Sequence, residues 1–221
     1  MKVIGLVGKK RAGKTTAAEV LVRERGFVSI GFADALKDLA LRVDPIVTAS
    51  EYWDEEHKAG TFRLSDYVGT PGGWEFAKSL PEVRRFLQEL GTGVRDIVGE
   101  YAWTDAWDRA LTAGRHFPPP VVVVPDVRFL SEAEAIRTDM RAQGNSLLIR
   151  IDRPTVDDGD QHVSETELER IECDATIRNV HSRLWFEDNV LDLVDHWLTT
   201  GSVDPEQGIG GDEHGSPPEE G

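Results

Sequence analysis

A glycine-rich pattern near the start of the chain is the clearest chemical signal in the sequence. Gly8, Gly13, Lys14 and Thr15 follow the spacing G-x-x-x-x-G-K-[ST], between an apolar stretch and a helical pattern. Glycines at these positions let the backbone wrap closely around phosphate oxygens, so that N–H groups and a helix N-terminus face the negative charge. The pattern predicts a nucleoside triphosphate site made of Gly8, Arg11, Ala12, Gly13, Lys14, Thr15 and Thr16.

The residue types in and after this loop indicate phosphoryl chemistry. Lys14 is the predicted catalytic cation, because an ammonium group at this position reaches the β- and γ-phosphates. The hydroxyl of Thr15 would supply one oxygen ligand to Mg²⁺, which takes phosphate and water for most of the others. Asp126, directly after an apolar run, is the candidate carboxylate for the same ion, and a turn carboxylate following Pro125 is the alternative. Arg128 could bind a phosphoryl group through its planar guanidinium or form an ordinary surface ion pair.

The elements that must position these residues alternate along the chain. Strands are predicted at 2–7, 28–30, 121–124, 146–151 and 175–178, and helices at 14–25, 33–41, 81–94, 103–113, 131–143, 164–171 and 184–198. This alternation predicts an α/β fold with a mostly parallel five-stranded sheet. The β-branched run 121–124 is typical of a strand covered on both faces, at the centre of the sheet. The stretch 44–80 has no clean periodicity and is predicted to be irregular.

Composition excludes several classes of protein. The 221 residues carry a net charge of −15, which argues against binding to polymeric nucleic acid or to anionic lipid, since both require excess Lys and Arg. A single cysteine, Cys173, excludes an intramolecular disulfide and a cysteine cluster for zinc, and it fits a reducing compartment. Neither a signal peptide nor a membrane-spanning run is apparent. We therefore expect a cytoplasmic protein with small-molecule partners and no membrane.

The end of the chain differs from the rest in composition. Residues 202–221 contain Gly, Pro, Asp and Glu but neither Lys nor Arg. Such a segment has too little apolar surface to form a core. We predict a single domain over 1–200, followed by an acidic disordered tail at 201–221.

Besides the phosphate loop, four further blocks stand in order along the chain: Phe32–Lys37, Arg85–Thr92 with Arg95, Asp126–Phe129 with Glu132, and His162–Glu165. The chain resembles the bacteriophage deoxynucleoside monophosphate kinase family, within the P-loop nucleoside-monophosphate kinase fold, over about residues 1–198. Ser131 stands where that pattern has Asn, and Gly93 where an acidic residue often follows Gly-Thr.

The resemblance implies both a fold and a reaction. The fold would have three layers around the parallel sheet, with a helical acceptor-binding insertion at about 34–115 and a short lid at about 152–165. The reaction would transfer the γ-phosphate of ATP, with Mg²⁺, to a deoxynucleoside monophosphate, giving the diphosphate and ADP. The partners would be small nucleotides, a homodimer is left open, and a phage protein would act in the host cytoplasm.

The resemblance also assigns an acceptor site and a lid residue. Arg85, Gln88, Thr92 and Arg95 recur at helical spacing and can share one face, where a solvated polar face is the alternative. Asp34 and Lys37 would lie near the monophosphate, and an exposed helix pair is their alternative. Arg153 is the candidate lid arginine and a catalytic residue, because the following stretch lacks apolar periodicity. The expected acceptor-binding residues are Asp34, Lys37, Arg85, Gln88, Thr92, Arg95 and Arg128.

The sequence is also compatible with other functions. Another small-metabolite P-loop kinase, of the dephospho-coenzyme A or phosphomevalonate type, would use the same loop with a different acceptor pocket. An NTP-hydrolysing switch is less consistent with the sequence, which lacks an Asn-Lys-x-Asp pattern and an obvious glutamate after Asp126. A nucleotide-binding module without catalysis would bind ATP and have no acceptor. His162 suits a surface or helix-entry position better than that of a catalytic base, and Trp53, Trp74, Trp103 and Trp107 could stack on a base or fill a core.

Overall fold

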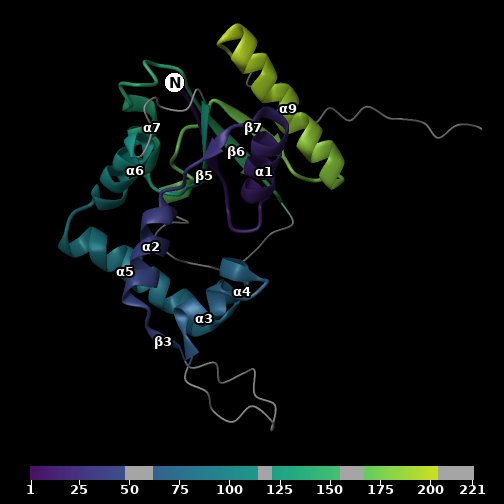
Figure 1. The fold of residues 1–221 in the computed structure, drawn as a ribbon. Helices are drawn as coiled ribbons and strands as arrows, with labels where there is room; N and C mark the ends of the chain where they lie inside the picture. The colour runs from purple at the N-terminus through teal and green to yellow at the C-terminus, as the bar shows by residue number, and fades with distance from the viewer. Residues whose placement is uncertain (48–61, 114–120, 155–166, 204–221) are drawn as a thin grey trace, which may run out of the picture. The chain divides into compact units, whose positions relative to one another are not determined.

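A computed structural model describes residues 1–47, 62–113, 121–154 and 167–203 (Figure 1). The chain divides into two compact units. The first consists of Met1–Ile30 and Phe117–Gly221, and the second of Gly31–His116. The phosphate loop belongs to the first unit, and the segment expected to bind the acceptor belongs to the second.

The first unit is built on a five-stranded sheet. Its strands are β1 (Lys2–Val7), β2 (Val28–Ser29), β5 (Val121–Val127), β6 (Ser146–Asp152) and β7 (Ala175–Arg178). Their order is β2-β5-β1-β6-β7, and every neighbouring pair is parallel. The predicted α/β class with a parallel five-stranded sheet is therefore confirmed. The expectation that the run 121–124 forms the centre is wrong, since β1 is the middle strand and β5 lies between β2 and β1.

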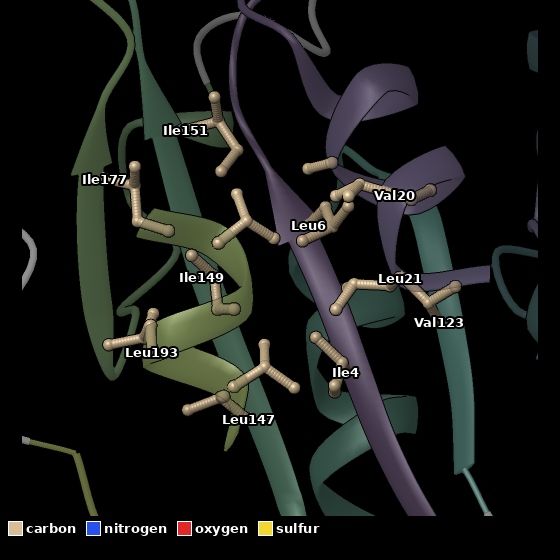
Figure 2. Close-up of a cluster of buried hydrophobic side chains, with 14 of the residues drawn as sticks. Ile4, Leu6, Val20, Leu21, Val123, Leu147, Ile149, Ile151, Ile177 and Leu193 are labelled. Atoms are coloured by element: carbon tan, nitrogen blue, oxygen red, sulfur yellow. The ribbon is translucent and has the colours of Figure 1, made fainter. Parts of the chain in front are cut away.

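Helices cover both faces of this sheet and produce three layers. On one face, Ile4 and Leu6 of β1 pack with α1 (Lys14–Arg25) and α9 (Arg183–Thr200) in a buried hydrophobic cluster (Figure 2). On the other face lies α7 (Leu130–Thr138), which contacts β1 and β6. Gly5 faces this second layer, where an added Cβ would lie 2.8 Å from Cδ1 of Ile136. The alternation of side chains along β1 thus builds both cores.

The second unit is mainly helical. It contains α2 (Ala33–Val43), α3 (Leu64–Val68), α4 (Gly73–Ser79), α5 (Pro81–Ile97) and α6 (Ala102–Thr112), with the short strands β3 (Ile46–Val47) and β4 (Phe62–Arg63). The strands pair in antiparallel fashion. Leu64, Tyr67, Ala77 and Val83 contribute to its buried core. Helix α5 begins with Pro81 at its first position, as predicted.

The prediction of an irregular stretch at 44–80 is wrong for its described residues. Two short strands and two short helices lie there, and elements of two to seven residues are too short for apolar periodicity to develop. Local polar contacts define them instead: the carboxylate of Asp66 accepts the backbone N–H of Arg63 at 2.8 Å, at the start of α3. The hydroxyl of Ser65 similarly donates to the carboxylate of Asp44 at 3.0 Å.

Two helix boundaries also differ from the prediction. Helix α7 ends at Thr138 instead of continuing to 143, because the carboxylate of Asp139 accepts the N–H of Arg141 at 2.8 Å and so closes a turn. The helix expected at 164–171 lies partly outside the described residues, and its described part is helical only at Glu167 and Leu168. Among the helices in the described ranges, none is long and apolar enough to cross a membrane.

Candidate active site

The phosphate loop joins the end of the middle strand β1 to the start of α1. Gly8 and Gly13 have φ angles of 154° and 115°, which favour glycine, and Arg11 also has a positive φ, of 61°. Gly8 is buried, and an added Cβ there would lie 2.4 Å from the carbonyl oxygen of Ile151 on β6. The loop therefore lies in close contact with the neighbouring strand. The close approach at Gly8 and the positive φ angles of Gly8 and Gly13 explain why both positions are glycine.

Lys14 is the first residue of α1, and its side chain turns back over the loop. The ammonium Nζ donates to the carbonyl oxygen of Lys9 at 2.7 Å and to that of Gly8. The side chain is mostly buried. Because these carbonyls hold the ammonium group above the loop, the positive charge is concentrated where a bound phosphate chain would meet the N-terminus of α1.

The oxygen donors predicted for a metal lie in the first unit. Thr15 is exposed in the first turn of α1, and Thr16 is half-buried beside it. Asp126 is the second-to-last residue of β5, so the description of it as following the strand, or as a turn carboxylate, is wrong. Strand β5 continues because a bulge accommodates Pro125: the pairing of β1 with β5 shifts between Gly5, opposite Val124, and Val7, opposite Val127.

This register brings Asp126 to the sheet edge from which the phosphate loop starts. Val127 is paired with Val7, and Gly8 follows Val7 directly. A hydroxyl and a carboxylate are hard oxygen ligands of the kind that Mg²⁺ uses, and the ion normally completes its shell with substrate phosphates and water. In the described residues no group of three or more His, Cys, Asp and Glu could hold a metal by itself. The hydroxyl of Thr15 and the carboxylate of Asp126, as hard oxygen donors, fit an ion that binds together with a nucleotide.

A buried carboxylate organises the turn that follows Asp126. Glu132 is only 5% exposed, and its Oε2 accepts the backbone N–H groups of Arg128 at 2.7 Å and Phe129 at 3.1 Å. The carboxylate of Glu167 accepts the next N–H, that of Leu130, at 3.3 Å. Two acidic side chains thus fix the backbone that carries Arg128, whose own side chain is half-buried.

Arg153 lies next to the end of β6. It follows Asp152, the last residue of that strand, and is exposed. Parallel strands bring their carboxyl ends to one edge, so Arg153 is at the same edge as the phosphate loop. Most of the predicted lid at 152–165, including His162, lies outside the described residues.

Six of the seven predicted acceptor residues lie on two helices of the second unit that contact each other, whereas Arg128 belongs to the first unit. Asp34 and Lys37 are on α2, and their side chains form an ion pair of 3.0 Å. Asp34 also accepts the N–H of Gly31 at 2.8 Å, just before the start of α2. Arg85, Gln88, Thr92 and Arg95 all lie on the continuous helix α5, and α2 contacts α5.

The α5 residues differ in their surroundings. Arg85 is exposed and pairs with Glu89 at 2.9 Å, one turn away. Gln88 is also exposed, whereas Thr92 and Arg95 are half-buried, and the Thr92 hydroxyl donates to the carbonyl of Gln88. Of the two arginines in this set, Arg95 is therefore the more buried.

The described tryptophans of the second unit, Trp74, Trp103 and Trp107, belong to its packing. Trp107 is 2% exposed, with its ring 5.0 Å from that of Phe32. Trp103 is buried, and its Nε1 donates to the carbonyl of Gly91 at 3.0 Å. Trp74 packs against the buried core of the unit. These contacts favour core packing over base stacking, and Trp53 lies outside the described residues.

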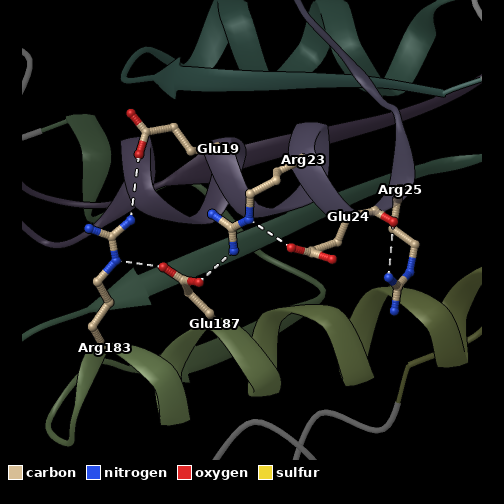
Figure 3. A network of polar contacts seen from close by, with 6 residues as sticks. All are labelled: Glu19, Arg23, Glu24, Arg25, Arg183 and Glu187. Carbon is tan, nitrogen blue, oxygen red and sulfur yellow. Dashed lines mark hydrogen bonds and ion pairs between the residues drawn. The ribbon is translucent and has the colours of Figure 1, made fainter.

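A network of ion pairs joins α1, which carries Lys14, to α9. Glu187 accepts from Arg183 at 2.6 Å and from Arg23 at 2.7 Å (Figure 3). The hydrogen bond from Arg183, and after it the one from Arg23, hold the pKa of the Glu187 carboxyl below its ordinary value. A second pair, between Arg25 and Asp195, lowers the pKa of Asp195 in the same way. These ion pairs hold α1, whose first turn follows the phosphate loop, against α9.

Sequence reasoning missed one residue in contact with the loop. The side-chain Nδ2 of Asn179 donates to the carbonyl oxygen of Ala12 at 2.8 Å. Asn179 directly follows β7. The rule that selected Asp126, a polar residue at the carboxyl end of a parallel strand, would also have selected Asn179.

The topology and the loop together define a class of protein. A parallel sheet whose middle strand leads into a G-x-x-x-x-G-K-T loop, with helices on both faces, is the fold of the P-loop kinases. Comparison with known proteins narrows this class. The sequence model of the family described as Deoxynucleotide monophosphate kinase matches residues 74–185. A protein of Acanthamoeba polyphaga mimivirus, titled "Putative deoxynucleotide monophosphate kinase", is 30% identical over 206 residues, which cover 89% of this chain and 97% of that protein.

The chain belongs to the deoxynucleotide monophosphate kinase family. It is accordingly a phosphotransferase of the nucleoside-monophosphate kinase type, with ATP as phosphate donor and small nucleotides as substrates. Among solved structures, similar chains include shikimate kinase from Aquifex aeolicus (TM-score 0.46, 12% identity, 90% of this chain and 99% of that one). Dephospho-CoA kinase from Campylobacter jejuni is another (TM-score 0.38, 14% identity, 88% and 96%).

Proposed function

We propose that the protein transfers the γ-phosphate of ATP to a deoxynucleoside monophosphate, giving a deoxynucleoside diphosphate and ADP. A phosphate oxygen of the acceptor would attack the γ-phosphorus, and the bond from that phosphorus to the β–γ bridging oxygen would break. The observation that carries this proposal is the position of the Lys14 ammonium group, held over the phosphate loop by the carbonyls of Gly8 and Lys9. Family membership supports the acceptor class.

The phosphate loop would bind and orient the donor. Its N–H groups and the N-terminus of α1 would hold the β- and γ-phosphates, with contributions from Gly8, Arg11, Ala12, Gly13, Thr15 and Thr16. Lys14 would offset the negative charge that moves toward the leaving ADP in the transition state. Thr15 and Asp126 are the residues that would hold Mg²⁺, which neutralises phosphate charge when bound.

Arginines would complete the charge neutralisation around the transferring group. Arg128 stands on a turn that Glu132 fixes through two backbone hydrogen bonds, so its position is well supported for binding a phosphoryl oxygen. Arg153, the candidate lid arginine, is exposed directly after β6 at the same sheet edge and would bind a phosphoryl oxygen there. Both are proposed as catalytic residues on these grounds.

The acceptor site is proposed on α2 and α5 of the second unit. Arg95, half-buried on α5, would bind the monophosphate, and Gln88 would hydrogen-bond an edge of the base. Arg85 and Lys37 are paired with Glu89 and Asp34, so their ion pairs would have to exchange for phosphate contacts. Thr92 and Asp34 complete the proposed set. The segment 34–115 as acceptor insertion, the lid at 152–165 and the tail at 201–221 remain predictions of the sequence.

A substrate screen tests this proposal. The protein is incubated with ATP, Mg²⁺ and one monophosphate at a time, across the deoxynucleoside and ribonucleoside series. ADP release is followed by a coupled assay, and the phosphorylated product is identified by chromatography. Formation of a deoxynucleoside diphosphate in amounts equal to ADP is the expected result. ADP release without any acceptor would instead indicate an NTP-hydrolysing switch, and phosphorylation of dephospho-coenzyme A alone would indicate a different metabolite kinase.

The same preparation tests the remaining expectations. Adding a chelator that removes free Mg²⁺ tests the dependence on the ion, and it should abolish phosphoryl transfer. The homodimer left open by the sequence is tested by light scattering of the purified chain. Binding to polymeric nucleic acid is expected to be absent at physiological salt, because of the net charge of −15. Phage origin and a cytoplasmic location remain predictions.

A further inference from the structure

Asn179 connects the end of β7 to the phosphate loop. Its Nδ2 donates to the carbonyl oxygen of Ala12 at 2.8 Å, across 167 residues of sequence. Its backbone N–H donates to the carbonyl of Asp152, at the end of β6, at 2.7 Å. The residue is half-buried. Because the backbone of Asn179 is fixed by β6, its side chain presents a well-positioned donor to the loop.

Asn179 also occupies the space beside the second glycine of the loop. A Cβ added to Gly13 would lie 2.6 Å from Nδ2 of Asn179 and 3.3 Å from Cζ of Phe186. Phe186 belongs to α9 and is 1% exposed. The loop at Gly13 is therefore in close contact with Asn179 on one side and with the buried core beneath it.

The bond to Ala12 determines the direction of one peptide group. None of the described peptide bonds is cis, so the carbonyl of Ala12 and the N–H of Gly13 belong to one planar trans unit and point in opposite directions. Since Asn179 holds the carbonyl on its own side, the N–H of Gly13 points away from Asn179. We propose that Asn179 is a positioning residue that orients the Ala12–Gly13 peptide so that its N–H faces the phosphates of ATP.

This inference rests on the proposed function only in taking ATP as the ligand of the loop. Without the donor of Asn179, the peptide can rotate away from the orientation that binds phosphate. We expect Asn179→Ala to weaken ATP binding about tenfold, the usual scale for one such hydrogen bond. Asn179→Asp keeps the shape but places a negative oxygen against the Ala12 carbonyl and near the phosphates, so it should weaken ATP binding about a hundredfold.

Asn189 provides a matched control. Its Nδ2 donates to the carbonyl of Trp185 at 2.7 Å, within α9 of the same unit. Asn189→Ala removes a bond of the same kind and similar length that does not involve the loop. If Asn179 contributed only to stability, both alanine variants would lower the melting temperature and leave ATP binding unchanged.

The experiment measures ATP binding by calorimetry without acceptor, and the KM values of ATP and of the acceptor in steady state. The expected result is a raised ATP Kd and ATP KM for both Asn179 variants, largest for Asn179→Asp, with the acceptor KM within about twofold of its original value. Equal ATP affinity of folded Asn179→Asp, Asn189→Ala and the unsubstituted chain would overturn the inference. Failure of the unsubstituted chain to bind ATP would overturn the proposed function instead, so the two failures are distinguishable.

Discussion

The ammonium group of Lys14 donates a hydrogen bond of 2.7 Å to the carbonyl oxygen of Lys9, five residues earlier in the same loop. The loop thereby holds the proposed catalytic cation in place through its own backbone carbonyls. A positioned charge loses little freedom when the transition state forms, which is why such groups contribute strongly to phosphoryl transfer.

Lys14→Ala should lower kcat about a thousandfold or more while the protein remains folded. The substitution removes the charge that offsets the transferring phosphate, and the helix start at Lys14 tolerates alanine well. Steady-state kinetics and a thermal melt provide the measurement. Lys9→Ala is the control, because that side chain is exposed and its backbone carbonyl is kept. Near-normal turnover by folded Lys14→Ala would contradict the assignment of the loop.

Asp126→Asn should weaken Mg²⁺-dependent catalysis more than ATP binding. The amide keeps the shape of the side chain but loses the negative charge that attracts the ion. We expect the Mg²⁺ concentration for half-maximal rate to rise about tenfold, while ATP affinity measured without metal changes less than about threefold. Asp105→Asn, on the exposed face of α6, is the control. An unchanged Mg²⁺ titration would assign the metal carboxylate to another residue.

The sequence predicts correctly those helices and strands whose ends are set by residues close to them in the chain. Strands β1 and β7 and helix α1 have the predicted bounds, because a short apolar run, a glycine-rich loop and the stop at Gly26 each act within a few residues. Strand β5 was predicted too short, since Pro125 normally ends a strand. Only the register with β1, and the bulge within it, shows how the strand continues to Val127.

In the candidate site, too, features fixed by nearby residues were predicted and features fixed by strand alignment were not. The phosphate loop was predicted because its function needs a fixed spacing within one segment. The contact of Asn179 with Ala12 depends on how β6 and β7 align at the edge of the sheet, which no local pattern determines. The capping of the Arg128 turn by Glu132 lies between these cases: the two residues are close in sequence, but the role of the carboxylate appears only once its burial is known.

Stability should depend on pH through Glu187, which accepts hydrogen bonds from Arg183 and Arg23. These bonds place its pKa below the ordinary value. The contribution of Glu187 to the free energy of unfolding is therefore complete above the ordinary pKa of about 4.3 and is lost as the pH falls through the lowered pKa.

Denaturant titrations at several pH values measure this contribution. Glu187→Gln should be less stable than the unsubstituted protein near neutral pH, and the difference should shrink as the medium becomes more acidic than the ordinary pKa. Glu19→Gln is the control, because that carboxylate is mostly exposed and lies 3.9 Å from Arg183, so little change is expected. A difference that stays constant down to low pH would contradict the role of the charge.

Arg95→Ala tests whether α5 carries the acceptor site. Losing a charge-assisted phosphate contact commonly costs about 1.5 to 3 kcal/mol, so kcat/KM for the monophosphate should fall roughly ten- to a hundredfold or more. ATP binding measured without acceptor should remain unchanged, because the phosphate loop is not altered. Lys78→Ala, which removes a half-buried cation paired with Glu75 on α4, should leave both quantities unchanged. If Arg95→Ala gave the same acceptor kinetics as Lys78→Ala, α5 would present only a solvated face, and the monophosphate would have to bind through Asp34, Lys37 and Arg128.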